Sequence, residues 1–356
     1  MDHLAAGGID CDVHPALPGM AALLPYLEPY WREQVTVRGI DGLDLSSFPL
    51  RVPAHARPDW QPAIGKAGEH RPDLIRQALD GFGTSIAILN PLYGIQAVYN
   101  DFFAAALATA MNKWLAAEWL DHDPRLRGSI TIASQNAELA VAEIERCAGD
   151  RRFVQILMIC MQDAPLGRRQ YWPIYAAAER HGLTIGIHAG STHRHATTSN
   201  GWPSFHLEDY VANAQGFQSN LLSLIHEGVF HEYPALRMVC LESGFTWLPN
   251  FLWRANRTWR GVRAEVPWVD RPPAEIIRDH VSFTLQPADP PPDAADLAEV
   301  IAQIGGDQML VFSTDYPHWQ FDGADPFPAG FPAALKPRVL RDNALRAYPR
   351  LKETLT

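Results

Sequence analysis

Apolar and polar residues alternate over residues 9–14, and this alternation predicts a strand. A period of two places Asp10, Asp12 and His14 on one face of that strand. Two carboxylates and an imidazole on one face of a buried strand are costly to remove from water unless a positive charge compensates them. The pattern therefore indicates a metal ion beside this strand.

Strands and helices are predicted in alternation along the rest of the chain. The further predicted strands cover residues 85–89, 128–133, 153–159, 183–188, 236–242, 281–285 and 309–315. The predicted helices cover residues 72–83, 97–122, 138–148, 171–181, 208–231, 246–263, 274–280, 293–304 and 337–347. Such alternation indicates a parallel sheet of the α/β class.

Eight strand–helix units fit a closed (β/α)8 TIM barrel, which we expect to form one domain over residues 1–356. An open, doubly wound sheet is the competing fold. The strand at 9–14 is followed by no glycine-rich phosphate-binding turn, so a dinucleotide-binding sheet has no support. We therefore expect the barrel.

Residues 15–65 break the regular pattern. Eight prolines lie in this stretch, and they argue against long helices. One short helical turn is expected near residues 20–24. We interpret the stretch as a proline- and aromatic-rich insertion after the first strand that covers one end of the barrel.

The composition excludes some classes of binding partner. The 356 residues are 47% hydrophobic and carry a formal net charge of −10 without a run of Lys or Arg, which argues against nucleic acid and anionic membranes. No apolar stretch approaches the roughly 20 residues that span a bilayer, and residues 1–8 lack the features of a signal peptide. The four cysteines form no CxxC pair, so reduced thiols and a cytoplasmic location are expected.

Ligand-type side chains gather where predicted strands end. In a TIM barrel the active site lies at the C-terminal ends of the strands. The candidates at that rim are Asp12, His14, His188, Glu242, Asp315 and His318. One such residue alone is more often structural, but three histidines and three carboxylates together suit a divalent metal.

Simpler roles for some of these residues stay open. Asp10 lies deeper in the strand and is expected to anchor the barrel floor or to orient a ligand. Asp12 could hydrogen-bond a metal-bound water, and Glu242 could carry a proton above a single metal. His318 could be a hydrogen-bond partner of Asp315 or Glu242 rather than a ligand.

One asparagine and five aromatic residues are predicted near the same rim. The candidate substrate-binding residues are Asn90, Tyr93, Trp172, Trp202, Trp247 and Trp319. An aromatic lining suits an apolar or aromatic small-molecule substrate with one polar group. The alternative is that the tryptophans pack helices onto the barrel.

Four stretches carry a family resemblance: IDCDVHP, GIHAG, EGVFHEYPALRMVCLESGFTWLPN and FSTDYPHW. The chain resembles the amidohydrolase-related (β/α)8 proteins, in particular the branch with aminocarboxymuconate-semialdehyde decarboxylase and the resorcylate-type decarboxylases. In that family the first strand carries His-x-His, strands five and six carry one His each, and strand eight carries Asp. The matching positions here are Asp12, His14, His188, Glu242 and Asp315.

Two of these positions depart from the family pattern, because Asp12 and Glu242 replace histidines. Both changes add a carboxylate with two oxygens, which can bridge metals. The set then resembles that of non-heme di-iron monooxygenases built on the same barrel. The favoured hypothesis is therefore an oxidoreductase in which Glu242 and Asp315 bridge two iron ions, with His318 also taking part in catalysis. It would use O2 and an electron donor such as a ferredoxin or reductase to hydroxylate a small aromatic or apolar carboxylic acid.

The main alternative follows the majority of the family. One Zn2+ or Mn2+ would then serve a hydrolase or a non-oxidative decarboxylase of an aromatic or unsaturated acid, with Asp315 moving the proton. A barrel that serves only as a binding protein is disfavoured by the intact set of acids and histidines. The resemblance also suggests a homodimer.

Overall fold

Eight parallel strands form one sheet in chain order, within the residues that the computed structural model describes, which are 5–43, 56–305, 308–321 and 325–354. The strands are β1 (Ile9–Val13), β2 (Ile86–Leu89), β3 (Leu126–Thr131), β4 (Phe153–Met161), β5 (Thr184–Ser191), β6 (Met238–Leu241), β7 (Val281–Thr284) and β8 (Leu310–Val311). The amide of Cys11 donates to the carbonyl oxygen of Phe312 (3.0 Å), and that of His14 to Tyr316 (2.8 Å). These bonds join β1 to the segment after β8 and close the predicted (β/α)8 barrel.

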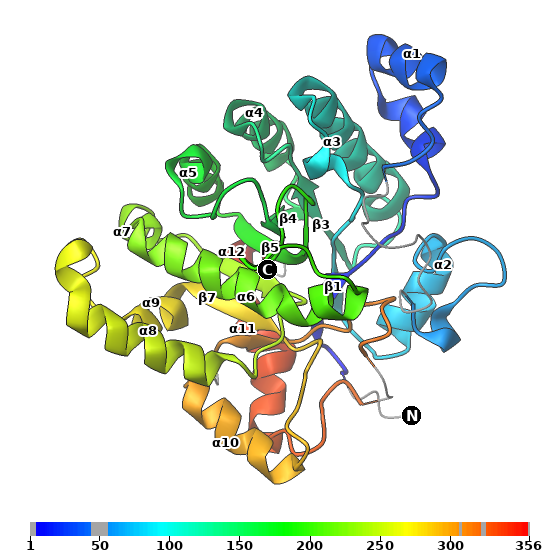
Figure 1. Cartoon of the computed structure of the whole chain (residues 1–356). Helices are drawn as coiled ribbons and strands as arrows, with labels where there is room; N and C mark the ends of the chain where they lie inside the picture. The colour runs from blue at the N-terminus through cyan, green and yellow to red at the C-terminus, as the bar shows by residue number, and fades with distance from the viewer. Residues whose placement is uncertain (1–4, 44–55, 306–307, 322–324, 355–356) are drawn as a thin grey trace.

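Helices surround the ring of strands (Figure 1). The helices are α1 (Pro29–Arg38), α2 (Arg71–Leu74), α3 (Asp101–Leu115), α4 (Ala137–Ala148), α5 (Trp172–His181), α6 (His206–His226), α7 (Val229–Glu232), α8 (Leu248–Val262), α9 (Pro273–His280), α10 (Ala294–Ile304), α11 (Asn343–Ala347) and α12 (Pro349–Thr354). The single helix predicted over 208–231 is instead two. Gly228 has φ of 87°, a left-handed conformation that ends α6 before α7 begins. No helix in the described part of the chain is both long and apolar enough to cross a bilayer.

The described part of residues 15–65 holds more helix than predicted. The expected short turn is a 3-10 helix, η1, at Met20–Tyr26. The ten-residue α1 was not predicted, and its proline is compatible with a helix because Pro29 occupies the first turn, where the missing amide hydrogen has no helical partner to lose. Residues 44–55 lie outside the described residues, so the covering role of the whole segment stays a prediction.

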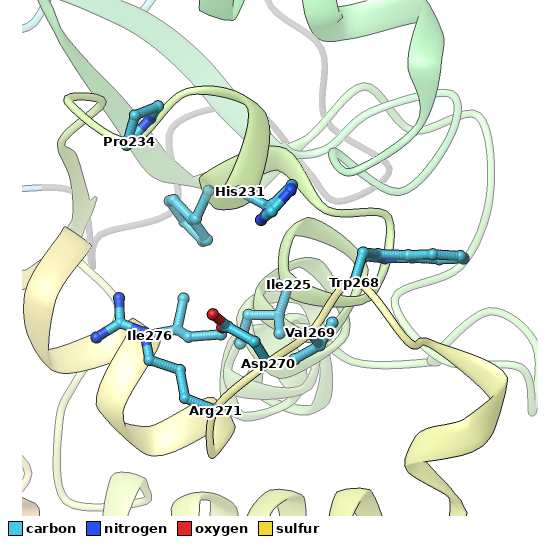
Figure 2. Close-up of a pocket in the computed structure, with 9 residues that line it drawn as sticks. Ile225, His231, Pro234, Trp268, Val269, Asp270, Arg271 and Ile276 are labelled. Carbon is cyan, nitrogen blue, oxygen red and sulfur yellow. The ribbon is translucent and has the colours of Figure 1, made fainter.

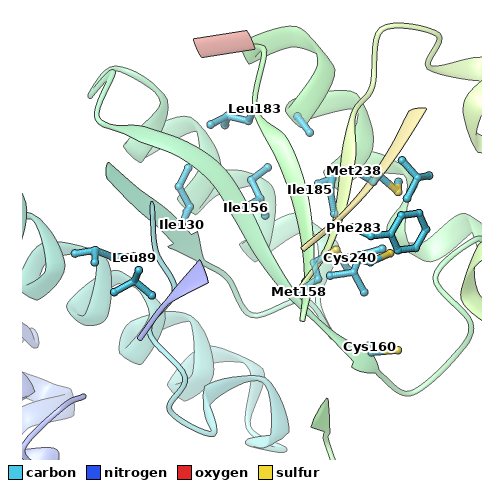
Figure 3. Close-up of a cluster of buried hydrophobic side chains, with 14 of the residues drawn as sticks. Leu89, Ile130, Ile156, Met158, Cys160, Leu183, Ile185, Met238, Cys240 and Phe283 are labelled. Atoms are coloured by element: carbon cyan, nitrogen blue, oxygen red, sulfur yellow. The ribbon is translucent and has the colours of Figure 1, made fainter. Parts of the chain in front are cut away.

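Two hydrophobic layers hold the barrel. The outer layer lies between strands and helices, and Figure 3 shows part of it, with Leu89, Ile130 and Ile156 on the neighbouring strands β2, β3 and β4 and Phe283 on β7. The inner layer fills the barrel beneath the site. Its members include strand residues and the C-terminal helices: Ile9, Cys11, Ile86, Ile88, Val154, Val239, Leu241, Val311, Tyr348 and Leu351. A filled interior leaves the polar residues of the strand ends at one mouth of the barrel.

The prediction that side chains alternate strictly between the two faces of β1 is wrong at the end of the strand. Ile9 and Cys11 belong to the inner layer, whereas Val13 belongs to the outer layer. The pairing register of β1 with β2 shifts between Asp10 and Val13, and this irregularity re-aims the last residues of the strand. Asp12 and His14 thereby face the site while Asp10 remains below it.

Candidate metal centre

Six ligand-type side chains from four strand ends meet at one mouth of the barrel. Asp12 and His14 come from the end of β1, His188 from β5, Glu242 directly after β6, and Asp315 and His318 after β8. Their ligand atoms form two overlapping groups, Asp12–His14–His188 and His14–Glu242–Asp315–His318, each with all atoms within 4.8 Å of one another. The structure therefore brings together all six predicted metal-site residues.

His14 lies at the centre of this arrangement. Its Nε2 is 3.0 Å from Oδ1 of Asp315, 3.2 Å from Oδ1 of Asp12 and 3.4 Å from Nε2 of His188. Nε2 of His188 is also 3.4 Å from Oε2 of Glu242. On the other side, Nδ1 of His318 lies 2.8 Å from Oδ1 of Asp315.

Hydrogen bonds orient both central imidazoles. Nδ1 of His14 bonds to the carbonyl oxygen of Asn90 (2.9 Å), and Nδ1 of His188 bonds to that of Ala189 (2.6 Å). Because a carbonyl only accepts, each Nδ1 carries the hydrogen and each Nε2 of the neutral ring is free to bind a metal. Two nitrogens bound tetrahedrally to one zinc-type ion at about 2.0–2.1 Å lie about 3.3–3.4 Å apart, which matches the separation of the two Nε2 atoms.

Two carboxylate oxygens at this mouth lack hydrogen-bond partners among the described residues. They are Oδ2 of Asp12 and Oδ2 of Asp315, and both residues are fully buried. A buried carboxylate oxygen without a partner is expensive unless a cation compensates it. The donor set of imidazole nitrogens and orphaned carboxylate oxygens therefore fits a divalent metal.

Asn90 holds the carboxylate of Asp12 in place by a hydrogen bond. Its Nδ2 donates to Oδ1 of Asp12 (2.7 Å), and its Oδ1 accepts from Ser129 (2.5 Å) and Gln155 (2.8 Å). Asp10 is structural, because both its oxygens accept hydrogen bonds from Thr314, at 3.0 and 2.6 Å.

Glu242 and Asp315 share an unusual backbone conformation. Their φ angles are 53° and 55°, in the left-handed region that residues with a side chain seldom adopt. The amide of Glu242 is held by Oγ1 of Thr284 (2.9 Å). Glu242 directly follows β6 and Asp315 lies four residues after β8, and the strained turn at each position aims its carboxylate into the mouth of the barrel.

Two residues near Glu242 were missed at the sequence level. The hydroxyl of Tyr210, from α6, donates a short hydrogen bond to Oε1 of Glu242, and Nε2 of Gln320 donates to the same oxygen (3.2 Å). Gln320 follows the FSTDYPHW stretch directly, and that position was a usable signal. Tyr210 had none, because nothing in the sequence indicates which turn of a long helix faces the barrel.

Without a bound cation, the carboxyl groups and imidazoles of the site have shifted pKa values. Burial raises the pKa of Asp12 to about 6, and burial with the neighbouring Asp315 raises that of Glu242 to about 7. Burial opposes the charged form of His14, but Asp12 and Asp315 outweigh it and raise its pKa to about 10. Burial and the charge on His14 lower the pKa of His188 to about 3. A proton on His14 therefore compensates the acids, and a metal ion would displace it.

The predicted aromatic residues do not gather in one pocket. Trp202 and Trp319 are 54% and 46% exposed. Trp247 packs on Phe283 and donates from its indole N–H to the carbonyl oxygen of Ser243 (2.9 Å), beside Glu242.

The side chains of Trp172 and Tyr93 pack against other hydrophobic residues. Trp172 is buried against Tyr233 and donates to the carbonyl oxygen of Gly167 (2.8 Å), so it packs helices rather than lining the mouth. Tyr93 is half-buried against the outer hydrophobic layer. The substrate-binding role of these aromatic residues stays a prediction.

Two cavities in the described part of the chain are lined by residues other than the six ligand-type ones. Figure 2 shows one of about 180 Å³ between α6, α7 and the segment before α9, lined among others by His231, Trp268 and Arg271. Another, of about 320 Å³, is lined by residues 59–77 and Tyr316. Neither cavity includes a side chain of the metal centre.

Comparison with known proteins gives a consistent picture. The family model described as "Amidohydrolase" matches residues 9–350. A gamma-resorcylate decarboxylase of Polaromonas sp. is 27% identical over 253 residues, covering 68% of this chain and 76% of that protein. One from a Rhizobium species is 26% identical over 286 residues, covering 75% and 83%. The solved dihydroxybenzoic acid decarboxylase of Polaromonas sp., with bound manganese and 2-nitroresorcinol, superposes with a TM-score of 0.66 at 20% identity over 98% and 99% of the two chains.

These relatives overturn the favoured functional hypothesis. A di-iron monooxygenase was expected, yet the curated relatives are decarboxylases. The expectation of two iron ions, O2 and an electron donor has no support in these comparisons. The replacement of histidines by Asp12 and Glu242 does not by itself indicate two metals, because Oε1 of Glu242 already accepts two hydrogen bonds and a bridge through both oxygens of this carboxylate is disfavoured.

Proposed function

The chain belongs to the amidohydrolase family, and from this membership we propose that it is a metal-dependent, non-oxidative decarboxylase of a hydroxylated aromatic acid. The observation that carries the proposal is the convergence of six ligand-type side chains at the mouth of the barrel. The names of the curated relatives supply the substrate class.

One Mn2+ or Zn2+ suits this donor set. Nε2 of His14, Nε2 of His188 and the orphaned Oδ2 of Asp12 would hold it, with Oε2 of Glu242 beside His188. The bound ion would supply positive charge to stabilise anionic oxygens of the substrate. The relative whose structure holds manganese favours Mn2+ as the first metal to test.

Asp315 and His318 are placed to handle the proton. Oδ1 of Asp315 lies 3.0 Å from Nε2 of His14 and accepts from Nδ1 of His318, so its orphaned Oδ2 is the oxygen free to face a substrate. In the reaction, the bond between the ring carbon and the carboxylate carbon breaks and CO2 leaves. The same ring carbon gains one proton, which we assign to Asp315.

The low solvent exposure of the site residues favours this chemistry. Asp12, His188 and Asp315 are at most 1% exposed, so the dielectric around them is low and charges there interact strongly. Burial also favours departure of neutral CO2 over retention of an anionic carboxylate.

The direct test is CO2 release from a panel of hydroxybenzoates. Protein stripped of metal and reloaded with Mn2+ or Zn2+ would be incubated with 2,6-dihydroxybenzoate, 5-carboxyvanillate and unsubstituted benzoate. We expect metal-dependent CO2 release from at least one hydroxylated acid and none from benzoate. Absence of release from every hydroxylated acid, or O2 consumption coupled to product formation, would contradict the proposal.

A further inference from the structure

The two oxygens of the Glu242 carboxylate have different surroundings. Oε1 accepts hydrogen bonds from the Tyr210 hydroxyl and from Nε2 of Gln320. Oε2 lies 3.4 Å from Nε2 of His188 and 3.6 Å from Nδ1 of His318. One oxygen is thus occupied by neutral donors, while the other faces the imidazoles of the metal centre.

The two donors come from elements that are far apart in sequence. Tyr210 lies in the first turns of α6, and Gln320 follows the segment that closes the barrel after β8. The start of α6 is itself fixed, because Glu208 accepts the backbone amides of Ser204 (2.9 Å) and Phe205 (2.8 Å). Two donors on one oxygen, one of them on the fixed start of α6, leave the carboxylate little freedom to rotate.

The backbone of Glu242 is restrained as well. Its left-handed φ of 53° is held by the hydrogen bond from its amide to Thr284 of β7. The side chain is only 8% exposed, so water does not compete strongly for Oε1. Position and rotation of this carboxylate are therefore both set by the protein.

We propose that Tyr210, assisted by Gln320, is a positioning residue that holds Oε1 of Glu242 and thereby fixes the carboxylate in the orientation that presents Oε2 to the metal. The inference rests on the proposed metal-dependent function. Glu242 then behaves as a ligand with a single donor atom, as an imidazole does, although a free carboxylate could chelate with two. Tyr210 acts through Glu242 and does not itself contact the ion.

The test uses Tyr210→Phe in the full-length protein, which removes the hydroxyl and keeps the ring. The probe is Mn2+ alone, and its dissociation constant is measured from the free-ion electron paramagnetic resonance signal during titration. We expect the dissociation constant to rise about 10- to 100-fold, the usual effect of losing a residue that orients a ligand. Gln320→Leu should weaken Mn2+ binding in the same direction.

Tyr175→Phe is the matched control. Tyr175 is a buried residue of α5, and its hydroxyl donates to the carbonyl oxygen of Leu166 (2.6 Å) rather than to a residue of the metal centre. We expect this variant to lose thermal stability while its Mn2+ dissociation constant stays within twofold of the parent. Melting temperatures of all metal-free variants separate misfolding from loss of positioning.

A double-mutant cycle decides whether Tyr210 works through Glu242. In a Glu242→Gln background, Tyr210→Phe should have no further effect on Mn2+ affinity. An equal loss in both backgrounds would overturn the inference, as would an unchanged Mn2+ dissociation constant for Tyr210→Phe alone. Parent protein that binds Mn2+ but releases no CO2 would overturn the proposed reaction, while a weakened Tyr210→Phe would still support the positioning role.

Discussion

The Nε2 atoms of His14 and His188 face each other across 3.4 Å, while each Nδ1 is held by a backbone carbonyl. Two neutral imidazoles with their lone pairs directed at the same point repel each other unless a proton or a metal ion lies between them. The pair, one from β1 and one from β5, spans the mouth of the barrel. It therefore defines where the ion is expected.

Loss of either imidazole should therefore abolish metal binding. Replacing His188 with alanine removes one of the two facing nitrogens, and we expect the metal content per chain to fall about tenfold or more. Inductively coupled plasma mass spectrometry on dialysed protein measures this. His181→Ala is the control, because His181 at the end of α5 pairs with Glu145 of α4 and its loss should leave the metal content unchanged. Full metal content in His188→Ala would place the ion elsewhere.

Asp315→Asn tests the proton-carrying role. The amide keeps the shape of the side chain but cannot deliver a proton, so we expect kcat to fall by about 10²- to 10⁴-fold. Metal content should stay near that of the parent, because His14, His188 and Asp12 remain. Loss of the ion together with activity would instead make Asp315 a required ligand.

Asn90→Ala should destabilise the metal-free protein. Its amide joins Asp12, Ser129 and Gln155, and each of those buried groups would lose a partner. We expect a loss of about 1–3 kcal/mol in the free energy of unfolding, measured by urea titration. Asn136→Ala removes the N-cap of α4 and should cost about 1 kcal/mol without changing Mn2+ affinity. A change in Mn2+ affinity is expected only for Asn90→Ala.

Acid sensitivity should arise in part from Glu143, a buried residue of α4. Burial opposes its charged form, but hydrogen bonds from Arg146, Asn112 and Thr109 outweigh this and lower its pKa below the ordinary 4.5. The folded state therefore binds its proton less readily than the unfolded chain. Its contribution to stability is present above about pH 4.5 and is lost as the pH falls through the folded-state value.

The variant Glu143→Gln tests the direction of this pH dependence. The variant should be less stable than the parent at pH 7, and the difference in free energy of unfolding should shrink as the pH falls below about 4.5. Chemical denaturation at a series of pH values measures it. A constant difference across that range would show that the charge of Glu143 does not contribute.

The ring of strands was predictable because each strand and helix has its own periodicity. The six ligand-type residues were also predictable, since parallel strands bring their C-terminal ends to one mouth. The register shift in β1 was not, because it depends on pairing with β2 rather than on the residues of β1 alone. Tyr210 could not be found for a similar reason, since the direction of a helical side chain depends on how α6 packs.

The error in function has a chemical origin. Counting carboxylates at Asp12 and Glu242 favoured two bridged ions, but the count ignored which oxygens were already hydrogen-bonded. Tyr210 and Gln320 occupy one oxygen of Glu242, and Asn90 occupies one of Asp12. The number of metal ligands that a carboxylate can offer depends on which of its oxygens are free of hydrogen bonds, and that depends on the fold.

The closure of the barrel between β1 and the segment after β8 also bears on the order of folding. Asp12 and His14 are made before Asp315 and His318, which follow about 300 residues later, and the bonds that join β1 to the segment after β8, including those of Cys11 and His14, bring the two pairs together. A nascent chain therefore holds an incomplete ligand set until its last strand docks. An ion bound across this seam would favour the closed ring over every shorter intermediate, so the final step of folding is where metal supply in the cell would act.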